Sequence, residues 1–201
     1  TWKRPHLLEE AIESFLKQTN VKSEMVIIND DPNVNYMFHH PRVKIHNVPK
    51  FEKFMEKLKW GFDQCHYTHM YRLDDDDLLL PTAVDTVLKV IDANPDQDLY
   101  QAANHWYVGI HDSLNNGVGS GVNTGNTFSK KFIDWLDWEN AGEPPGEDHW
   151  MCYYPHIRRH EFKESTMIYR WGGSVSHLTH KPKTKSMQEY QDGVGQWKTD
   201  S

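Results

Sequence analysis

Apolar residues recur with helical spacing in three stretches of the first half of the chain. Residues 7–16, 51–62 and 84–91 each place their apolar side chains on one face of a helix. Pro5 and Pro81 suit the first turns of the first and third helices, where a residue has no intrahelical amide bond to lose. The apolar positions are Leu7, Leu8, Ala11, Ile12, Phe15 and Leu16, then Phe51, Phe54, Met55, Leu58 and Phe62, then Val84, Val87, Leu88 and Ile91.

Short apolar runs between these stretches predict strands. Residues 25–28 form a continuous apolar run, which is typical of a strand buried on both faces of a parallel sheet. Residues 43–48 and 69–73 predict two further strands, and residues 166–171 predict a last one. The alternation of strand and helix predicts an α/β sandwich with a mostly parallel central sheet.

The second half of the chain is less regular. Residues 104–128 are rich in Gly and Asn, which predicts a loop or a bent strand. Short helices are expected from Ser129 and from Glu147, the second after the break at 143–146. From about residue 181 onward the chain is polar and without periodicity, so a tail is expected there.

Acidic residues follow two of the predicted strands. Asp30 and Asp31 come after the first strand, and four consecutive aspartates, Asp74 to Asp77, come after the third. Adjacent carboxylates repel one another, and a divalent cation relieves this because hard cations bind several oxygen ligands. Ligands of open α/β sheets bind at the carboxyl ends of the strands. The pattern therefore predicts a metal site at this edge, with a solvated acidic turn before Pro81 as the alternative.

Composition narrows the choice of function. The 201 residues suit one domain, and the formal net charge of −7 disfavours bulk binding to nucleic acid. The two cysteines, Cys65 and Cys152, are far apart and make no disulfide framework, so a reducing, cytoplasmic location is expected. No apolar run approaches the ~20 residues that span a membrane. No signal peptide is visible, although the chain begins at Thr1 rather than at a methionine.

Five segments in order carry a resemblance to a known enzyme family. The chain resembles the family 2-like inverting glycosyltransferases of the GT-A fold from residue 1 to about residue 180. The segments that match are Thr1-Trp2-Lys3-Arg4-Pro5, Phe15-Leu16-Lys17-Gln18-Thr19, Ile28-Asn29-Asp30-Asp31, Leu73-Asp74-Asp75-Asp76-Asp77 and Glu147-Asp148. The fourth corresponds to the family's Asp-x-Asp metal motif, and the fifth to its Glu-Asp catalytic motif.

The resemblance implies a Mn²⁺ or Mg²⁺ ion and a UDP- or GDP-sugar donor. It implies that Asp76 binds the metal directly, while Asp74 reaches the ribose or the water around the metal. Asp77 is implied to support these groups or to touch the acceptor. His177 is implied to complete the metal site, with His180 as the alternative.

The remaining site residues are also implied by the resemblance. Asp30 and Asp31 would contact the base and ribose beside Thr1, and Asp75 would complete the donor-binding set. Lys59, or Lys57 on the same helix, would face the diphosphate. Asp148 would be the general base that takes the proton of an acceptor hydroxyl, and the acceptor could be a glycan.

Members of the family begin with a buried strand before the segment that matches Thr1 to Pro5. The resemblance therefore implies that the sheet of this chain lacks its first strand. It also implies a single domain over residues 1–180, with a nucleotide-sugar half at 1–103 and an acceptor half at 104–180.

Two other functions remain open at this point. A nucleotidyltransferase shares the α/β sheet and metal carboxylates, although no Gly-rich basic loop is seen near Thr1. An acidic module that binds carbohydrate or calcium without catalysis would also carry such carboxylates. A metal-dependent inverting glycosyltransferase accounts for the largest number of matched segments.

Overall fold

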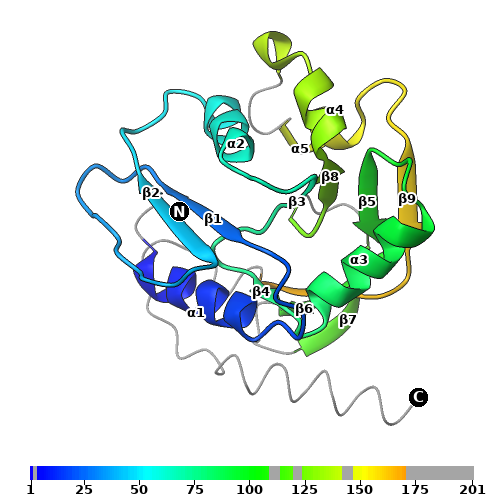
Figure 1. Cartoon of the computed structure of the whole chain (residues 1–201), viewed down its shortest axis with the longest axis horizontal. Coiled ribbons are helices and arrows are strands. Elements are labelled where there is room, and N and C mark those ends of the chain that lie inside the picture. Colours follow the sequence, from blue (N-terminus) through cyan, green and yellow to red (C-terminus); the bar gives the residue numbers. More distant parts are fainter. Residues whose placement is uncertain (2–3, 109–113, 120–123, 142–146, 171–201) are drawn as a thin grey trace.

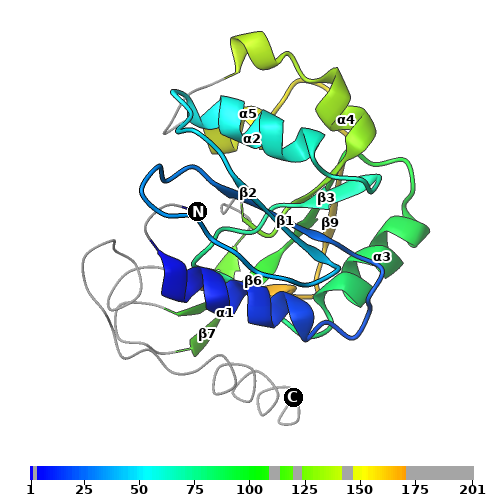
Figure 2. The ribbon, with the colours of Figure 1, turned by 60° about the vertical axis from the view of Figure 1, so that its left-hand side comes forward.

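Helices cover both faces of the strands, so the chain forms three layers (Figures 1 and 2). The computed structural model describes residues 1, 4–108, 114–119, 124–141 and 147–170, apart from the side chains of 114–119 and 147–149. The helices are α1 (Pro5–Leu16), α2 (Phe54–Asp63), α3 (Ala83–Ala93), α4 (Lys130–Trp135), η1 (Trp138–Asn140) and α5 (Glu147–Cys152). The strands are β1 (Met25–Asn29), β2 (Val43–Asn47), β3 (His69–Tyr71), β4 (Leu78–Leu79), β5 (Leu99–Ala102), β6 (Asn104–Val108), β7 (Leu114–Gly119), β8 (Thr127–Ser129), β9 (Arg159–Phe162) and β10 (Met167–Arg170).

The three amphipathic helices predicted from periodicity are confirmed as α1, α2 and α3. On one face of the strands, Leu8 and Ile12 of α1 pack with Ile27 of β1. This packing removes the apolar face of α1 from water. On the opposite face, α2 packs with α4 and α5 around Phe128 and Met70. The strands are therefore buried between two apolar layers, which is the α/β sandwich expected from the sequence.

The strands pair in a mixed pattern rather than a mostly parallel one. Among the described residues, three strand pairs are parallel (β1–β2, β6–β10 and β5–β9) and four are antiparallel. The strand predicted at 69–73 is β3, but it ends at Tyr71 and runs antiparallel to β8. Pairing direction depends on partners distant in the sequence, so local periodicity did not reveal it.

The Gly- and Asn-rich stretch at 104–128 contains strands. β6 pairs with β10 on one edge and with β7 on the other, with a register shift between His105 and Trp106. Both of these side chains are buried, and so is Val108. Of the two expectations for this stretch, the bent strand is the one found, because tertiary pairing outweighs the weak strand propensity of Gly and Asn.

A cavity separates β1 from β3. Among the strands of the described part of the chain, β1 pairs only with β2, and β3 pairs only with β8. A cavity of about 470 Å³ is lined by residues of both strands and by apolar side chains of α1, α2 and α3. Among the described residues, this cavity therefore lies where β1 and β3 do not pair with each other.

Thr1 lies beside β1 and lines this cavity together with Ile28.

Among the residues that the structure describes, no helix combines the length and apolarity needed to cross a membrane. Cys65 and Cys152 are both free thiols, as expected from their separation in the sequence.

Candidate active site

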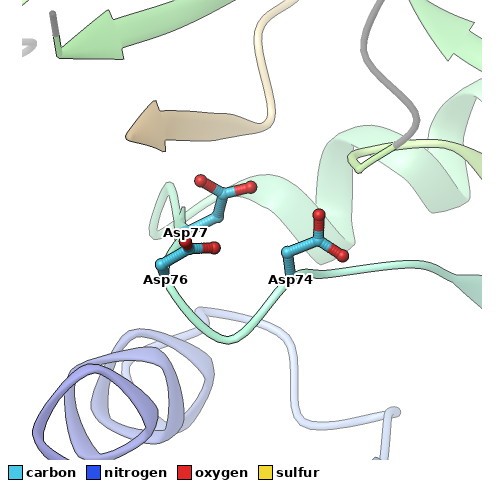
Figure 3. Close-up of side chains that lie close together, drawn as sticks. All are labelled: Asp74, Asp76 and Asp77. Carbon is cyan, nitrogen blue, oxygen red and sulfur yellow. The ribbon is translucent and has the colours of Figure 1, made fainter. Parts of the chain in front are cut away.

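The four aspartates lie in the turn between β3 and β4. The amide of Asp77 donates to the carbonyl of Asp74 at 3.1 Å, which closes the turn and turns the side chains toward one another. Asp74, Asp76 and Asp77 each offer a carboxylate oxygen, and these oxygens all lie within 4.8 Å of one another (Figure 3). One short turn therefore presents three possible oxygen ligands to a single cation.

A neighbouring turn holds the first of these aspartates in place. The hydroxyl of Thr124 accepts a hydrogen bond from the amide of Asp74 at 3.1 Å. Gly125 follows at φ 81°, and its amide donates to the carbonyl of Arg72 at 2.7 Å. A Cβ at position 125 would lie 2.6 Å from the sulfur of Met167, so glycine is required both for the backbone angle and for the close approach.

Burial makes the deeper aspartates difficult to ionise. Asp77 is fully buried, and burial together with the charges of Asp76 and Asp74 raises its pKa well above the ordinary value. Its Oδ1 accepts the amide of Arg170 at 2.8 Å, while its Oδ2 is buried without a hydrogen-bond partner among the described residues. Burial also raises the pKa of Asp76, although the guanidinium of Arg4 acts in the opposite direction. An additional positive charge at this turn would favour the ionised carboxylates.

Three arginines, two of them from distant parts of the chain, already supply positive charge here. Arg4, just before α1, contacts Asp75 and Asp76 at 2.5 Å each. Arg72, just after β3, lies 3.3 Å from Asp74. Arg170, at the end of β10, donates to the backbone carbonyl of Asp76 and pairs with Glu10 of α1. The crowding that predicted a metal from sequence is therefore partly relieved by guanidinium groups.

The donor side of the site is centred on Lys57 of α2. Its ammonium donates to Asp30 at 2.5 Å, and Asp30 is buried at the end of β1. Lys57 lines the large cavity together with Thr1 and Asp74, and it also lines a second cavity of about 200 Å³ with Asp30 and Phe51. The structure thus pairs Lys57 with the predicted residue Asp30 and places Thr1 and Asp74 in the lining of the same cavity as Lys57.

Asp31 and Lys59 lie in different surroundings. Asp31 is buried and accepts the amide of Asn33 at 3.0 Å, which organises the turn after β1. Lys59 is exposed on the other side of α2 and pairs with Asp63 at 2.7 Å, one helical turn away. Of the two lysines considered from sequence, the structure brings Lys57 to the cavities and leaves Lys59 outside them.

The candidate base and the candidate histidines are less completely described. Asp148 lies in the first turn of α5, and its side chain is outside the description. His177 and His180 lie outside the described residues. Their predicted roles stay predictions.

The structure adds three residues that sequence reasoning did not assign to the site. Arg72 and Arg170 contact the acidic turn, and Glu10 holds Arg170 from α1. From the sequence, Arg4 stands out only as part of the segment at the start of the chain. Nothing in the local sequence around Arg170 points to aspartates more than ninety positions away, so only the tertiary structure reveals this pairing.

Comparison with known proteins adds the family and the fold. The sequence pattern described as "Glycosyl transferase family 2" matches residues 1–117. Comparison with curated proteins finds no match. Crystal structures of residues 1–349 of S. aureus TarS are similar in fold. The structure in complex with UDP-GlcNAc has a TM-score of 0.64 and 11% identity over 96% of this chain and 62% of that one.

Two further TarS structures give the same result. The structure of TarS 1–349 without a named ligand has a TM-score of 0.62 and 10% identity, and the UDP complex has 0.62 and 12%. In both cases the matched region covers 85% of this chain and 58% of the TarS chain. At such identities the likeness shows the GT-A fold alone, and this chain spans about three fifths of those structures.

Proposed function

The chain belongs to glycosyl transferase family 2, and from that membership we propose that it transfers a sugar from a nucleotide-diphosphate donor to a hydroxyl acceptor with inversion. One observation carries the proposal. Three carboxylate oxygens converge within 4.8 Å at a turn beside the cavity that Thr1 and Lys57 also line. This arrangement suits a diphosphate, because Asp74 of the cluster lines the same cavity as Lys57, which places a ligand for a cation and a lysine side chain at one space.

The donor set fits a magnesium or manganese ion. The ligands on offer are carboxylate oxygens, which both ions prefer, and no softer ligand belongs to the cluster among the described residues. The buried Oδ2 atoms of Asp75 and Asp77 have no hydrogen-bond partner in the described part of the chain. Asp76 and Asp74 would hold such an ion, with Asp77 behind them. When bound, the ion neutralises negative charge that builds on the diphosphate as the sugar leaves.

The nucleoside would lie along Thr1 and Asp30. Asp30 is an acceptor for ribose hydroxyls or base amines, and Lys57 holds its carboxylate in one orientation. Two TarS structures contain UDP and UDP-GlcNAc, so a UDP-sugar is the first donor to test here. A GDP-sugar is the second.

Asp148 would act on the acceptor. A carboxylate that accepts the hydroxyl proton lets the oxygen attack the anomeric carbon from the face opposite the leaving diphosphate, which inverts that carbon. The start of a helix favours an ionised carboxylate, and Asp148 is the second residue of α5.

The proposal is tested by incubating the full chain with UDP- and GDP-sugars, Mn²⁺ and a panel of glycan acceptors. Release of nucleoside diphosphate that requires both metal and protein supports it. Absence of release with every donor would contradict it. Release of pyrophosphate from a sugar phosphate and a nucleoside triphosphate would identify a nucleotidyltransferase instead.

Lys57→Gln is expected to raise the KM for the donor about tenfold, with a smaller change in kcat. The substitution removes an ammonium that faces the cavity, and a hydrogen bond to a charged group contributes about 1.5–3 kcal/mol. Steady-state kinetics with varied donor measures the effect.

Lys59→Gln is the matched comparison, on the same helix and with the same loss of charge. Because Lys59 is exposed and pairs with Asp63, the donor KM of this variant should stay within about twofold of that of the original protein. The opposite ranking of the two variants would return the donor-binding role to Lys59, as the sequence suggested.

A further inference from the structure

We propose that Arg4 is an exchangeable counter-ion of the acidic turn. Its guanidinium neutralises Asp75 and Asp76 in the metal-free protein and releases Asp76 when a divalent cation binds. The inference rests on the proposed function, because it assumes that this turn binds such a cation. It assigns Arg4 as a positioning residue that sets the metal affinity of the site.

The contacts of Arg4 place a positive charge where a cation would bind. Nη1 lies 2.5 Å from Oδ2 of Asp76, and Nη2 lies 2.5 Å from Oδ1 of Asp75. Asp76 belongs to the group of three carboxylates whose oxygens converge, shown in Figure 3. A guanidinium and a divalent cation that share one carboxylate repel each other, so close binding of the cation disfavours this position of Arg4.

The turn holds a further sign of an incomplete site. Asp77 is fully buried, and its Oδ2 has no hydrogen-bond partner among the described residues. A buried carboxylate oxygen without a partner is costly, and Arg4 does not contact it. The guanidinium therefore satisfies the outer aspartates and leaves the inner one, which a small cation among the three carboxylates would reach.

Of the three arginines at the turn, Arg4 is the one that can leave. The side chain of Arg170 is 0% exposed and bonds to the carbonyl of Asp76 and to Glu10. The side chain of Arg72 is 11% exposed and lies over the ring of Phe54, 5.6 Å from its centre. The side chain of Arg4 is 25% exposed and belongs to the residue before α1, so its release exposes charge to water without breaking a packed core.

Linkage gives the expected consequence. If the cation displaces Arg4 from Asp76, then removing the charge of Arg4 strengthens cation binding by the same coupling factor. The metal-free protein loses stability in that variant, because Asp75 and Asp76 lose their partner. The two effects have opposite signs, and damage to the fold alone produces only the second.

The test is calorimetric titration of Mn²⁺ into the full chain at pH 7.5, without any substrate. Arg4→Gln is expected to bind Mn²⁺ about tenfold more tightly than the original chain, in the middle of the usual coupling range. Arg4→Lys keeps the charge, but a lysine ammonium cannot bond to both aspartates as the two Nη groups of arginine do. We therefore expect a smaller gain in Mn²⁺ affinity, of a few fold. Lys130→Gln, which loses an exposed partner of Asp134, is the control and should bind Mn²⁺ like the original.

Thermal unfolding with and without Mn²⁺ gives a second readout. The midpoint for Arg4→Gln should be lower than the original in the absence of metal, and Mn²⁺ should raise it by more than it raises the original. Unchanged or weaker Mn²⁺ binding in both Arg4 variants, with binding in the original, would overturn the inference alone. No Mn²⁺ binding in any of the proteins would overturn the proposed metal site together with it.

Discussion

Asp76→Asn is expected to abolish metal-dependent turnover, with a loss of at least about 10³-fold in kcat. Asp76 is central to the carboxylate cluster, and its oxygens are needed both by Arg4 and by a cation. The amide keeps the shape of the side chain but removes the charge that holds the cation. Because burial already disfavours the ionised form of Asp76, the neutral amide should be tolerated by the fold.

The measurement is nucleoside diphosphate release as a function of Mn²⁺ concentration. In the variant, raising Mn²⁺ should not restore the rate, because the ligand itself is missing. Asp63→Asn is the matched control, since Asp63 is an exposed carboxylate on α2 with a surface lysine partner. A variant at position 76 that recovers full rate at high Mn²⁺ would show that Asp76 assists the metal without being an essential ligand.

Asp148→Asn is expected to lower kcat by about 10²–10⁴-fold with little change in donor KM, which is the scale of a lost general base. The substitution removes the group that accepts the hydroxyl proton and leaves the donor cavity unchanged. Donor binding should therefore survive, as titration of UDP with Mn²⁺ would show. The pH dependence of kcat should also lose its acidic limb, because that limb reports the ionisation of the base.

Glu147→Gln is the neighbouring control for this prediction. Glu147 shares the first turn of α5 with Asp148, so both variants remove a negative charge from the same helix end. If the loss of kcat arose only from a weaker helix start, kcat would fall equally in the two variants. An unchanged rate in Asp148→Asn would remove Asp148 from the proposed mechanism and direct attention to another carboxylate.

Local sequence was sufficient for most of the helices and the first two strands. The apolar stripes of α1, α2 and α3 and the continuous run of β1 carry their own periodicity, which follows from the geometry of one element. The strands β4, β5 and β9 were not predicted. β4 has only two residues, and polar residues interrupt β5 and make up most of β9, so none of the three contains a continuous apolar run like that of β1.

For the candidate site too, some features could be predicted from the sequence and others could not. That the acidic turn follows a strand, and that Asp30 ends another, could be predicted from residue type and position. The placement of Lys57 rather than Lys59 at the cavities could not, since both residues are lysines on one helix. Their difference arises from the rotation of α2 against β1, which packing sets.

Sequence by itself determined which residues are available: a turn of four aspartates, a buried carboxylate after β1, and helices with apolar faces. Arg72 lies only two positions from Asp74, but the tertiary structure alone decided the other groups that neutralise that turn. Arg4 and Arg170 reach it from the start of α1 and from β10, and their contacts with it span up to 94 positions of the chain. Coulomb interactions depend on distance in space, and only the folded chain brings these charges within hydrogen-bonding distance of the aspartates.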